Sequence, residues 1–310
     1  MSATLKELEL VSEFRYRLEG LSLDEHNSSD LNLLRYIRAR EYDLSKAEDM
    51  LRKHLQWKRT KGIGLSLVLD YEAPLFLRET YASKLMGFDD VGCPILLMEA
   101  GKWDIRKPVN DGLKEELEKL KDQSLERVMW LMRKKGSVQE LENEEITQFV
   151  AICDWQGFSL RYIMNREVVD FIMEFARSFE ANYPERLKAA YNVNAPKVFS
   201  VLFNLVKPIL SARTLSKIFI FDSNEVAWKK EIFGNLPLSQ VLTQYGGTRK
   251  DSCAIPLHDQ RIVQHLRKNY SGSQNLPIIF EDESEDLQDN NGDEWHDLPS
   301  ESGDTRLVAP

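Results

Sequence analysis

The sequence predicts an α/β protein in which a group of N-terminal helices precedes a mostly parallel sheet. Two observations carry this prediction. Residues 4 to about 62 read as helices joined by short turns, and from residue 94 short apolar, β-prone runs alternate with longer helical patterns. Strands that alternate with helices are typical of a parallel sheet with helices packed on it. We expect this α/β domain to span roughly residues 76–250.

The clearest N-terminal helix is expected over residues 45–61. Ser45 and Glu48 have the spacing of a capping box, and Gly62 is the kind of residue that ends a helix. Apolar residues recur through the segment at helical spacing, at Leu44, Ala47, Leu51 and Leu55.

The preceding segment, LNLLRYIRARE, also has a helical pattern, with Leu31, Leu34 and Ile37 on one face. Its arginines lie around the other face. Charged residues opposite an apolar stripe usually face solvent, so we expect these arginines to be solvated. They are Arg35, Arg38 and Arg40.

The second half of the chain contains the segments that define the sheet. Near-continuous β-prone runs predict strands at residues 94–98 (PILLM), 146–153 (ITQFVAIC), 190–194 (AYNVN) and 217–221 (KIFIF). Helical patterns between them predict helices at about 113–135, 160–180 and 197–210.

The net charge of −9 is unevenly distributed along the chain. Residues 281–310 contain eleven Asp or Glu and one basic residue, Arg306, so residues 1–280 are close to neutral. A segment so charged and so poor in apolar residues cannot offset the entropy of ordering, and we expect it to be disordered. It either solvates the chain or presents Trp295 and Leu298 to a basic protein partner; the solvating interpretation is favoured.

The cysteines and the N-terminus indicate a reducing compartment. Cys93, Cys153 and Cys253 lie far apart, and no Cys or His cluster has metal-ligand spacing. The start, MSATLKELELVSEF, is charged and helical rather than a secretion signal. We therefore expect a cytoplasmic protein without a bound metal.

Motifs of common catalytic sites do not occur in the sequence. There is no GxxxxGK[ST] phosphate loop, no GxGxxG, no GxSxG nucleophile elbow and no HExxH, and the five histidines are scattered. We expect a protein that is not an enzyme and that needs no cofactor. A lipid hydrolase would rest on fold class alone.

Residues 198–210 form the most apolar stretch, and nine of its thirteen side chains are large and apolar. A membrane-spanning helix needs about 20 apolar residues, so this stretch is too short. It is either a buried core helix, which the stretch alone favours, or a helix that meets lipid. The nine residues are Val198, Phe199, Val201, Leu202, Phe203, Leu205, Val206, Ile209 and Leu210.

Polar residues flank this apolar stretch on both sides. Glu185 and Arg186 follow Pro184, and Thr214 and Lys217 precede a predicted strand. Arg and Lys bind phosphate and a carboxylate accepts hydroxyl protons, so these residues together would suit a phosphorylated polyol. Taken singly, each is more often a surface charge or a helix cap.

Four segments of the chain resemble the CRAL-TRIO family of lipid-transfer proteins, and within it the Sec-fourteen-like phosphatidylinositol-transfer branch. They are LLRYIRAREYDLSKAEDMLRKHLQWKRTKGI, NYPERLKAAYNVNAPKVF, VKPILSARTLSKI and QYGGT, and the resemblance covers about residues 30–250. It implies an N-terminal helical subdomain at residues 1–75 and a lipid-binding domain at 76–250, whose sheet floors an apolar pocket. Residues 251–280 would be an extension and 281–310 the acidic tail; the Golgi-dynamics domain of longer animal members would be absent.

The resemblance also implies site residues. The family's headgroup motif falls on five positions: Lys217 and Glu185 near the inositol, Thr214 and Arg186 near the phosphate, and Arg40 as support. The apolar stretch matches the family's gate helix, which covers the lipid tails and swings against a bilayer to exchange them. Pro208 lacks an N–H group and would end or bend that helix.

One departure from the family bears on the ligand. The pocket strand includes Phe149, Ala151 and Cys153 before Asp154, and phosphatidylcholine-exchanging members carry hydroxyl residues where this chain has Phe149 and Ala151. Neither side chain can donate a hydrogen bond, so we expect phosphatidylinositol rather than phosphatidylcholine. A retinoid, tocopherol or isoprenoid is a possible second ligand.

The resulting expectation is a non-enzymatic protein that binds, transfers or presents phosphatidylinositol and visits a Golgi or endosomal membrane transiently. The alternative is a lipid-sensing scaffold, or a carrier of an apolar ligand, that recruits a partner through its acidic tail. We expect a monomer and no nucleic-acid partner.

Overall fold

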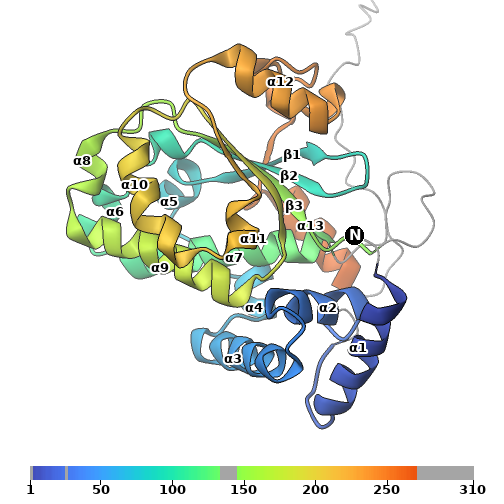
Figure 1. Ribbon diagram of the computed structural model, residues 1–310. Coiled ribbons are helices and arrows are strands. Elements are labelled where there is room, and N and C mark those ends of the chain that lie inside the picture. The colour runs from blue at the N-terminus through green and yellow to red at the C-terminus, as the bar shows by residue number, and fades with distance from the viewer. Residues whose placement is uncertain (1–2, 25–26, 133–144, 271–310) are drawn as a thin grey trace, which may run out of the picture. The chain divides into compact units, whose positions relative to one another are not determined.

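The fold is described by a computed structural model covering residues 3–24, 27–132 and 145–270 (Figure 1). Its centre is a sheet with the strand order β5-β4-β3-β2-β1-β6. The pairs β2–β3, β3–β4 and β4–β5 are parallel, whereas β1 pairs antiparallel with both β2 and β6. The predicted α/β class with a mostly parallel sheet is therefore confirmed. The strands are β1 (Ser83–Phe88), β2 (Pro94–Met98), β3 (Phe149–Asp154), β4 (Leu187–Val193), β5 (Ile218–Ile220) and β6 (Ile255–Pro256).

Each of the four predicted strand segments overlaps a strand, with boundaries displaced by up to three residues. The segment 94–98 matches β2, and the others overlap β3, β4 and β5. The sequence analysis missed β1 and β6. The first, SKLMGF, mixes Lys and Gly with its apolar residues, and the second has only two residues, so neither has a clear β pattern.

The N-terminal helices are α1 (Leu5–Arg17), α2 (Asp30–Ala39) and α3 (Leu44–Lys61), and they share a core that includes Phe14, Leu34 and Leu51. Gly62 ends α3 in the left-handed conformation, as predicted. The predicted capping box at Ser45 and Glu48 is wrong. Asp43 caps α3 instead, because its carboxylate accepts a hydrogen bond from the Lys46 N–H at 3.0 Å.

The expectation that the α2 arginines face solvent is also wrong for two of the three. Arg35 is 6 % exposed, and its guanidinium donates to the Pro184 carbonyl oxygen at 3.2 Å. Arg38 binds the Glu7 carboxylate at 2.8 Å, and this contact holds the pKa of Glu7 at about 2. A helical pattern cannot show that a second element covers the polar face, and here α1 and the α/β body do so.

Helices cover both faces of the sheet (Figure 1). Trp228 and Ile232 of α12 (Glu225–Asn235) pack on the face that carries Ile152 and Tyr191. The other face carries Phe149, whose ring lies 6.3 Å from that of Phe179 in α9. The helices on this second side are α7 (Lys114–Met132), α8 (Leu160–Ile163), α9 (Arg166–Asn182) and α10 (Phe199–Val206).

The predicted helix at 160–180 is divided in two. Asn165 accepts hydrogen bonds from the N–H groups of Glu167 and Val168 and so caps a new helix, α9. The predicted helix at 197–210 is present as α10 followed by a 3-10 turn, η2 (Lys207–Ile209). The α-helical part stops just before Pro208, as expected for a residue without an N–H group. Among the described residues, no helix is both long and apolar enough to cross a membrane.

The QYGGT segment closes the α/β body. The Tyr245 hydroxyl donates to the Asp154 carboxylate at 3.0 Å, at the end of β3. A Cβ at Gly247 would lie 2.0 Å from the Val241 carbonyl oxygen, so only glycine fits there. The predicted acidic tail, 281–310, lies outside the described residues. The remaining helices are α4 (Leu65–Leu69), α5 (Leu75–Thr80), α6 (Arg106–Asn110), α11 (Ala212–Leu215) and α13 (Gln260–Tyr270).

Candidate functional site

Four of the five residues predicted to bind a headgroup line one pocket of about 90 Å³. We call it the headgroup pocket. Its walls come from the end of α2, the end of α9, the starts of β4 and β5, and the segment after α10. The four predicted residues are Arg40, Glu185, Thr214 and Lys217.

Glu185 lies at the centre of the polar contacts in this pocket. Its side chain is 9 % exposed, the Lys217 ammonium lies 2.8 Å from one carboxylate oxygen, and the Arg213 guanidinium lies 3.8 Å from the other. The backbone of Glu185 has a φ of 57°, a left-handed conformation that costs a non-glycine residue about 1–2 kcal/mol. The fold therefore maintains a strained residue where the chain turns into β4.

Thr214 lies on the short helix α11. Its hydroxyl donates to the Glu180 carboxylate at 2.8 Å, and its N–H donates to the Ser211 hydroxyl at 3.2 Å. The Ser211 contact caps α11 and so fixes Thr214 and Arg213 at the mouth of the pocket. Because α11 follows η2 directly, the end of the predicted gate segment is anchored at the headgroup pocket.

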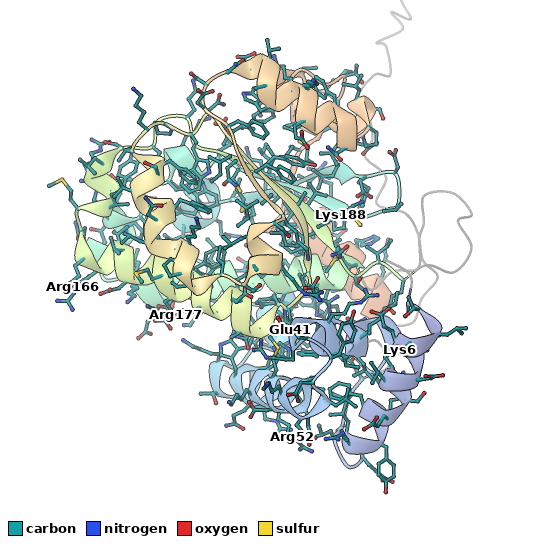
Figure 2. All side chains as sticks on the ribbon, in the orientation of Figure 1. Lys6, Glu41, Arg52, Arg166, Arg177 and Lys188 are labelled. Atoms are coloured by element: carbon teal, nitrogen blue, oxygen red, sulfur yellow. The ribbon has the colours of Figure 1, made fainter. Side chains whose placement is uncertain are left out.

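Arg40 is placed by the turn that ends α2. The next residues, Glu41 and Tyr42, have φ values of 52° and 67°, and this left-handed turn reverses the chain between α2 and α3. Glu41, which Figure 2 labels where the N-terminal helices meet the α/β body, also lines the pocket. Three cations, Arg40, Arg213 and Lys217, thus face a site that also offers a carboxylate acceptor.

Arg186 is the exception among the five residues, because it does not line the headgroup pocket. It is 2 % exposed, and its guanidinium donates to the Asn32 side-chain oxygen at 2.6 Å and to the Thr147 carbonyl oxygen at 3.1 Å. Burial, and then the neighbouring Arg35, lowers the pKa of Arg186. The turn at Glu185 therefore places two chain neighbours in different environments.

Several pocket residues were missed by the sequence analysis. Arg213 and Ser211 lie in the quoted segment VKPILSARTLSKI, where the Ser-x-x-Thr spacing could have revealed the cap of α11. Glu180 and Tyr183 lie at the end of α9, and only the folded chain brings them to this site. No signal in the sequence marks them.

The predicted gate residues divide between two faces of α10. Phe199 and Leu202 are buried, and the Phe199 ring centroid lies 4.5 Å from that of Trp155. On the outer side, Val201 is 49 % exposed and Leu205 is 39 % exposed. The partly buried members of the set are Val198, Phe203, Val206, Ile209 and Leu210. The helix is thus partly a core element and partly an exposed apolar surface, so neither sequence interpretation describes it alone.

The predicted pocket strand is β3. Phe149 and Ala151 are each 3 % exposed, and Cys153 lies two residues further along the same face. Burial raises the pKa of Cys153 to about 12, so its thiol stays protonated at neutral pH. No group of three His, Cys, Asp or Glu side chains that could hold a metal ion occurs in the described part of the chain.

The comparisons with known proteins agree with this architecture. The family model described as CRAL/TRIO domain matches residues 78–247, and the model described as CRAL/TRIO, N-terminal domain matches residues 2–53. The chain belongs to the CRAL-TRIO family. Members of this family generally bind and carry lipophilic ligands rather than catalyse reactions.

The relatives are distant and longer. Protein real-time of Aedes aegypti is 26 % identical over 269 residues, which cover 86 % of this chain and 40 % of that protein. Protein real-time of Anopheles gambiae is 29 % identical over 218 residues, which cover 70 % of this chain and 31 % of the relative. The chain therefore spans well under half the length of these relatives.

A solved structure shares the fold. The crystal structure of Sfh5 aligns with a TM-score of 0.61 at 17 % identity, covering 81 % of this chain and 90 % of the Sfh5 chain. Identity this low shows the fold alone.

Proposed function

We propose that this CRAL-TRIO protein binds phosphatidylinositol and transfers it between membranes or presents it at a membrane surface. The observation that carries the proposal is the convergence of Arg40, Glu185, Thr214 and Lys217 on one pocket. These residues come from three separate parts of the chain. Cations for a phosphate, beside a carboxylate that accepts hydroxyl protons, suit a phosphorylated polyol.

The roles proposed for the individual residues follow from their contacts. Lys217 and Glu185, paired at 2.8 Å, contact the inositol region, and Thr214 contacts the phosphate. Arg213 takes the phosphate role that the family motif would give to Arg186, because Arg213 lines the pocket with its side chain 45 % exposed. Arg40 supports the site from α2. Ligand binding then exchanges the Arg213 contact at 3.8 Å for a shorter one.

The acyl chains are proposed to lie beneath α10, against the β3 face that carries Phe149 and Ala151. Burial of acyl chains contributes about 0.8 kcal/mol per CH₂. A carrier therefore needs a cover that opens at a membrane, and α10 combines a buried face with an exposed apolar one. Since Phe149 and Ala151 offer no side-chain donor, we expect no exchange of phosphatidylcholine.

The headgroup assignment is tested by transfer of phosphatidylinositol between vesicles. Lys217→Ala removes a charge-assisted hydrogen bond of about 1.5–3 kcal/mol, so transfer should fall by about ten- to a hundredfold. Lys230→Ala, which removes an exposed lysine of α12, is the matched control and should transfer normally. Unchanged transfer by Lys217→Ala would remove the headgroup assignment, and transfer of only an apolar isoprenoid would redirect the function to such ligands.

The gate assignment is tested by sedimentation with vesicles that contain phosphatidylinositol. Replacing Val201 and Leu205 together by Asp places charges on the exposed face of α10, and vesicle binding should fall at least tenfold. Val226→Asp is the control, because Val226 is 78 % exposed but lies on α12, which packs on the other face of the sheet. Equal losses in both variants would show that α10 has no special role.

A further inference from the structure

A second, smaller cavity lies between the N-terminal helices and the α/β body. It measures about 20 Å³, and we call it the buried cavity. Its lining includes Arg35 of α2, His54 and Lys58 of α3, Glu126 of α7 and Arg186 at the start of β4. Nothing in the proposed lipid function uses this cavity.

Positive charges exceed negative ones around the buried cavity. Arg35, Lys58 and Arg186 are cationic, and Lys58 is paired with Glu126 at 2.7 Å. A second carboxylate, that of Glu145, acts on Arg186 and accepts hydrogen bonds from Ser29 and Asn32. On α7, Lys121 lies 2.9 Å from Asp122, so this pair is neutral. In the described part of the chain, three cations and these two carboxylates leave one positive charge in a poorly solvated place, because the carboxylate of Asp24, which accepts from Asn27 of the lining, is exposed to solvent. Such a charge is costly unless something balances it.

The two buried arginines, Arg35 and Arg186, differ in how many of their N–H donors have a hydrogen-bond acceptor. All three nitrogens of Arg35 donate to protein oxygens, those of Asn32, Pro184 and Tyr36. Arg186 uses both terminal nitrogens, but its Nε–H is buried without a hydrogen-bond acceptor. A buried N–H that lacks an acceptor is energetically costly and indicates a missing partner.

The cations around the buried cavity also act on the pKa of His54. Burial lowers its pKa to about 3, and the next contributions come from Lys58 and Arg35, with Arg186 also acting in this direction. The imidazole is therefore neutral and does not add to the positive charge. Its Nδ1 lies 3.4 Å from the Asn182 side-chain oxygen.

The size of the cavity limits its occupant. One water-sized sphere needs about 10–15 Å³ of such space, so about 20 Å³ admits one sphere and excludes a tetrahedral phosphate or sulfate. We propose that the buried cavity binds one monatomic, monovalent anion, such as chloride, which balances the excess positive charge and accepts the Arg186 Nε–H. The anion joins the N-terminal helices to the α/β body and is separate from the lipid in the headgroup pocket.

The first test measures thermal unfolding of the intact chain, with sodium gluconate replaced stepwise by sodium chloride or sodium bromide at constant ionic strength. Binding to the folded state alone should raise the Tm by about 2–4 °C once the anion concentration is about five times its Kd, for a chain of this size. Chloride and bromide should both raise the Tm relative to gluconate. An equal Tm in chloride and gluconate would mean that the cavity holds water only and would overturn the proposal.

The second test uses the line width of the ³⁵Cl NMR signal, which broadens when chloride exchanges with a protein site. Arg186→Gln removes the Nε–H and should abolish the protein-dependent broadening. Should that variant fail to fold, Lys58→Met removes one cation and should weaken the broadening, while Lys61→Met on the same helix should retain it. Equal broadening in Lys58→Met and Lys61→Met would overturn the assignment. Neither test involves lipid, so each outcome is independent of the proposed function.

Discussion

The headgroup pocket and the buried cavity lie on two sides of one dipeptide, Glu185-Arg186. In the headgroup pocket, Arg213 is 45 % exposed and its guanidinium is 3.8 Å from the nearest carboxylate oxygen. In the buried cavity, Arg186 is 2 % exposed and is bonded to Asn32 and Thr147. The same residue type is therefore partly exposed and loosely paired in one place, and buried and bonded to the protein in the other.

The two arginines differ in whether their N–H donors are bonded to the protein. A cation that retains unused donors and contact with solvent can bind a ligand without first breaking protein contacts. A cation whose donors are mostly bonded to the protein contributes to stability, and its loss leaves acceptors unsatisfied. Substitutions on the two sides should therefore separate lipid transfer from stability.

The largest expected effect is on the stability of Arg186→Met. This change leaves the Thr147 oxygen without its donor and removes one of the two arginine donors to the Asn32 oxygen, so the free energy of unfolding should fall by about 3 kcal/mol. Arg213→Met is the matched variant on the other side and should lose no more than about 1 kcal/mol, because the Arg213 side chain is 45 % exposed and its contact with Glu185 is 3.8 Å long. Urea titration of both variants measures the difference. Similar losses of unfolding free energy in the two variants would show that the two arginines do not differ in their contribution to stability.

The next effect is a pH dependence of stability that arises from His54. The folded-state pKa is about 3, below the usual 6.5, because burial and the nearby cations disfavour the charged form. The unfolded chain then binds a proton that the folded chain does not. This contribution to stability is complete above pH 6.5 and is lost as the pH falls, by about 1.4 kcal/mol per unit and about 2 kcal/mol by pH 5.

His54→Gln should flatten the stability profile between pH 6.5 and 5, as measured by urea titration at both pH values. The same replacement at His258 serves as the control. The pKa of His258 is also lowered, but this residue lies beside Arg78 and Arg127 and does not line the buried cavity. A profile that keeps its full slope in His54→Gln would show that the cations of the buried cavity do not act on this imidazole.

The smallest expected effect on stability has the opposite sign. Glu185→Gly relieves the left-handed strain at φ 57° and should raise the free energy of unfolding by up to about 1 kcal/mol relative to Glu185→Ala, which loses the same ion pair with Lys217 but keeps the strain. Removal of the carboxylate should at the same time lower phosphatidylinositol transfer about tenfold. Glu41→Gly has a similar φ of 52° and provides the matched control for strain. Transfer at the normal rate in Glu185→Gly would show that the strained carboxylate has no part in binding.

Short-range patterns were enough to predict much of the fold. Alternating strands and helices predicted the α/β class, and the apolar runs located β2, β3, β4 and β5. Gly62 and Pro208 marked real ends of α-helices, because both act on the local backbone. The predicted capping box at Ser45 was wrong because Asp43, two residues earlier, caps the helix instead.

The candidate site was predictable only in part. Sequence motifs identified Arg40, Glu185, Thr214 and Lys217, and these four side chains line one pocket. Glu180, Tyr183 and the role of Arg213 could not be predicted, because they depend on the end of α9 meeting the segment after α10. Arg35 illustrates the same limit. The helical pattern predicts that it faces solvent, but it is buried and donates a hydrogen bond to the carbonyl oxygen of Pro184, which is distant in the sequence.

The sequence by itself determined the order of the elements, the apolar character of residues 198–210 and the presence of the polar residues around them. These properties follow from spacing and residue type, which are local. The tertiary structure alone decided that Glu185 lines the headgroup pocket while Arg186 lines the buried cavity beside Arg35. Exposure and the choice of hydrogen-bond partner depend on segments that are distant along the chain, such as Asn32 and Arg186, and they differ here between two consecutive residues.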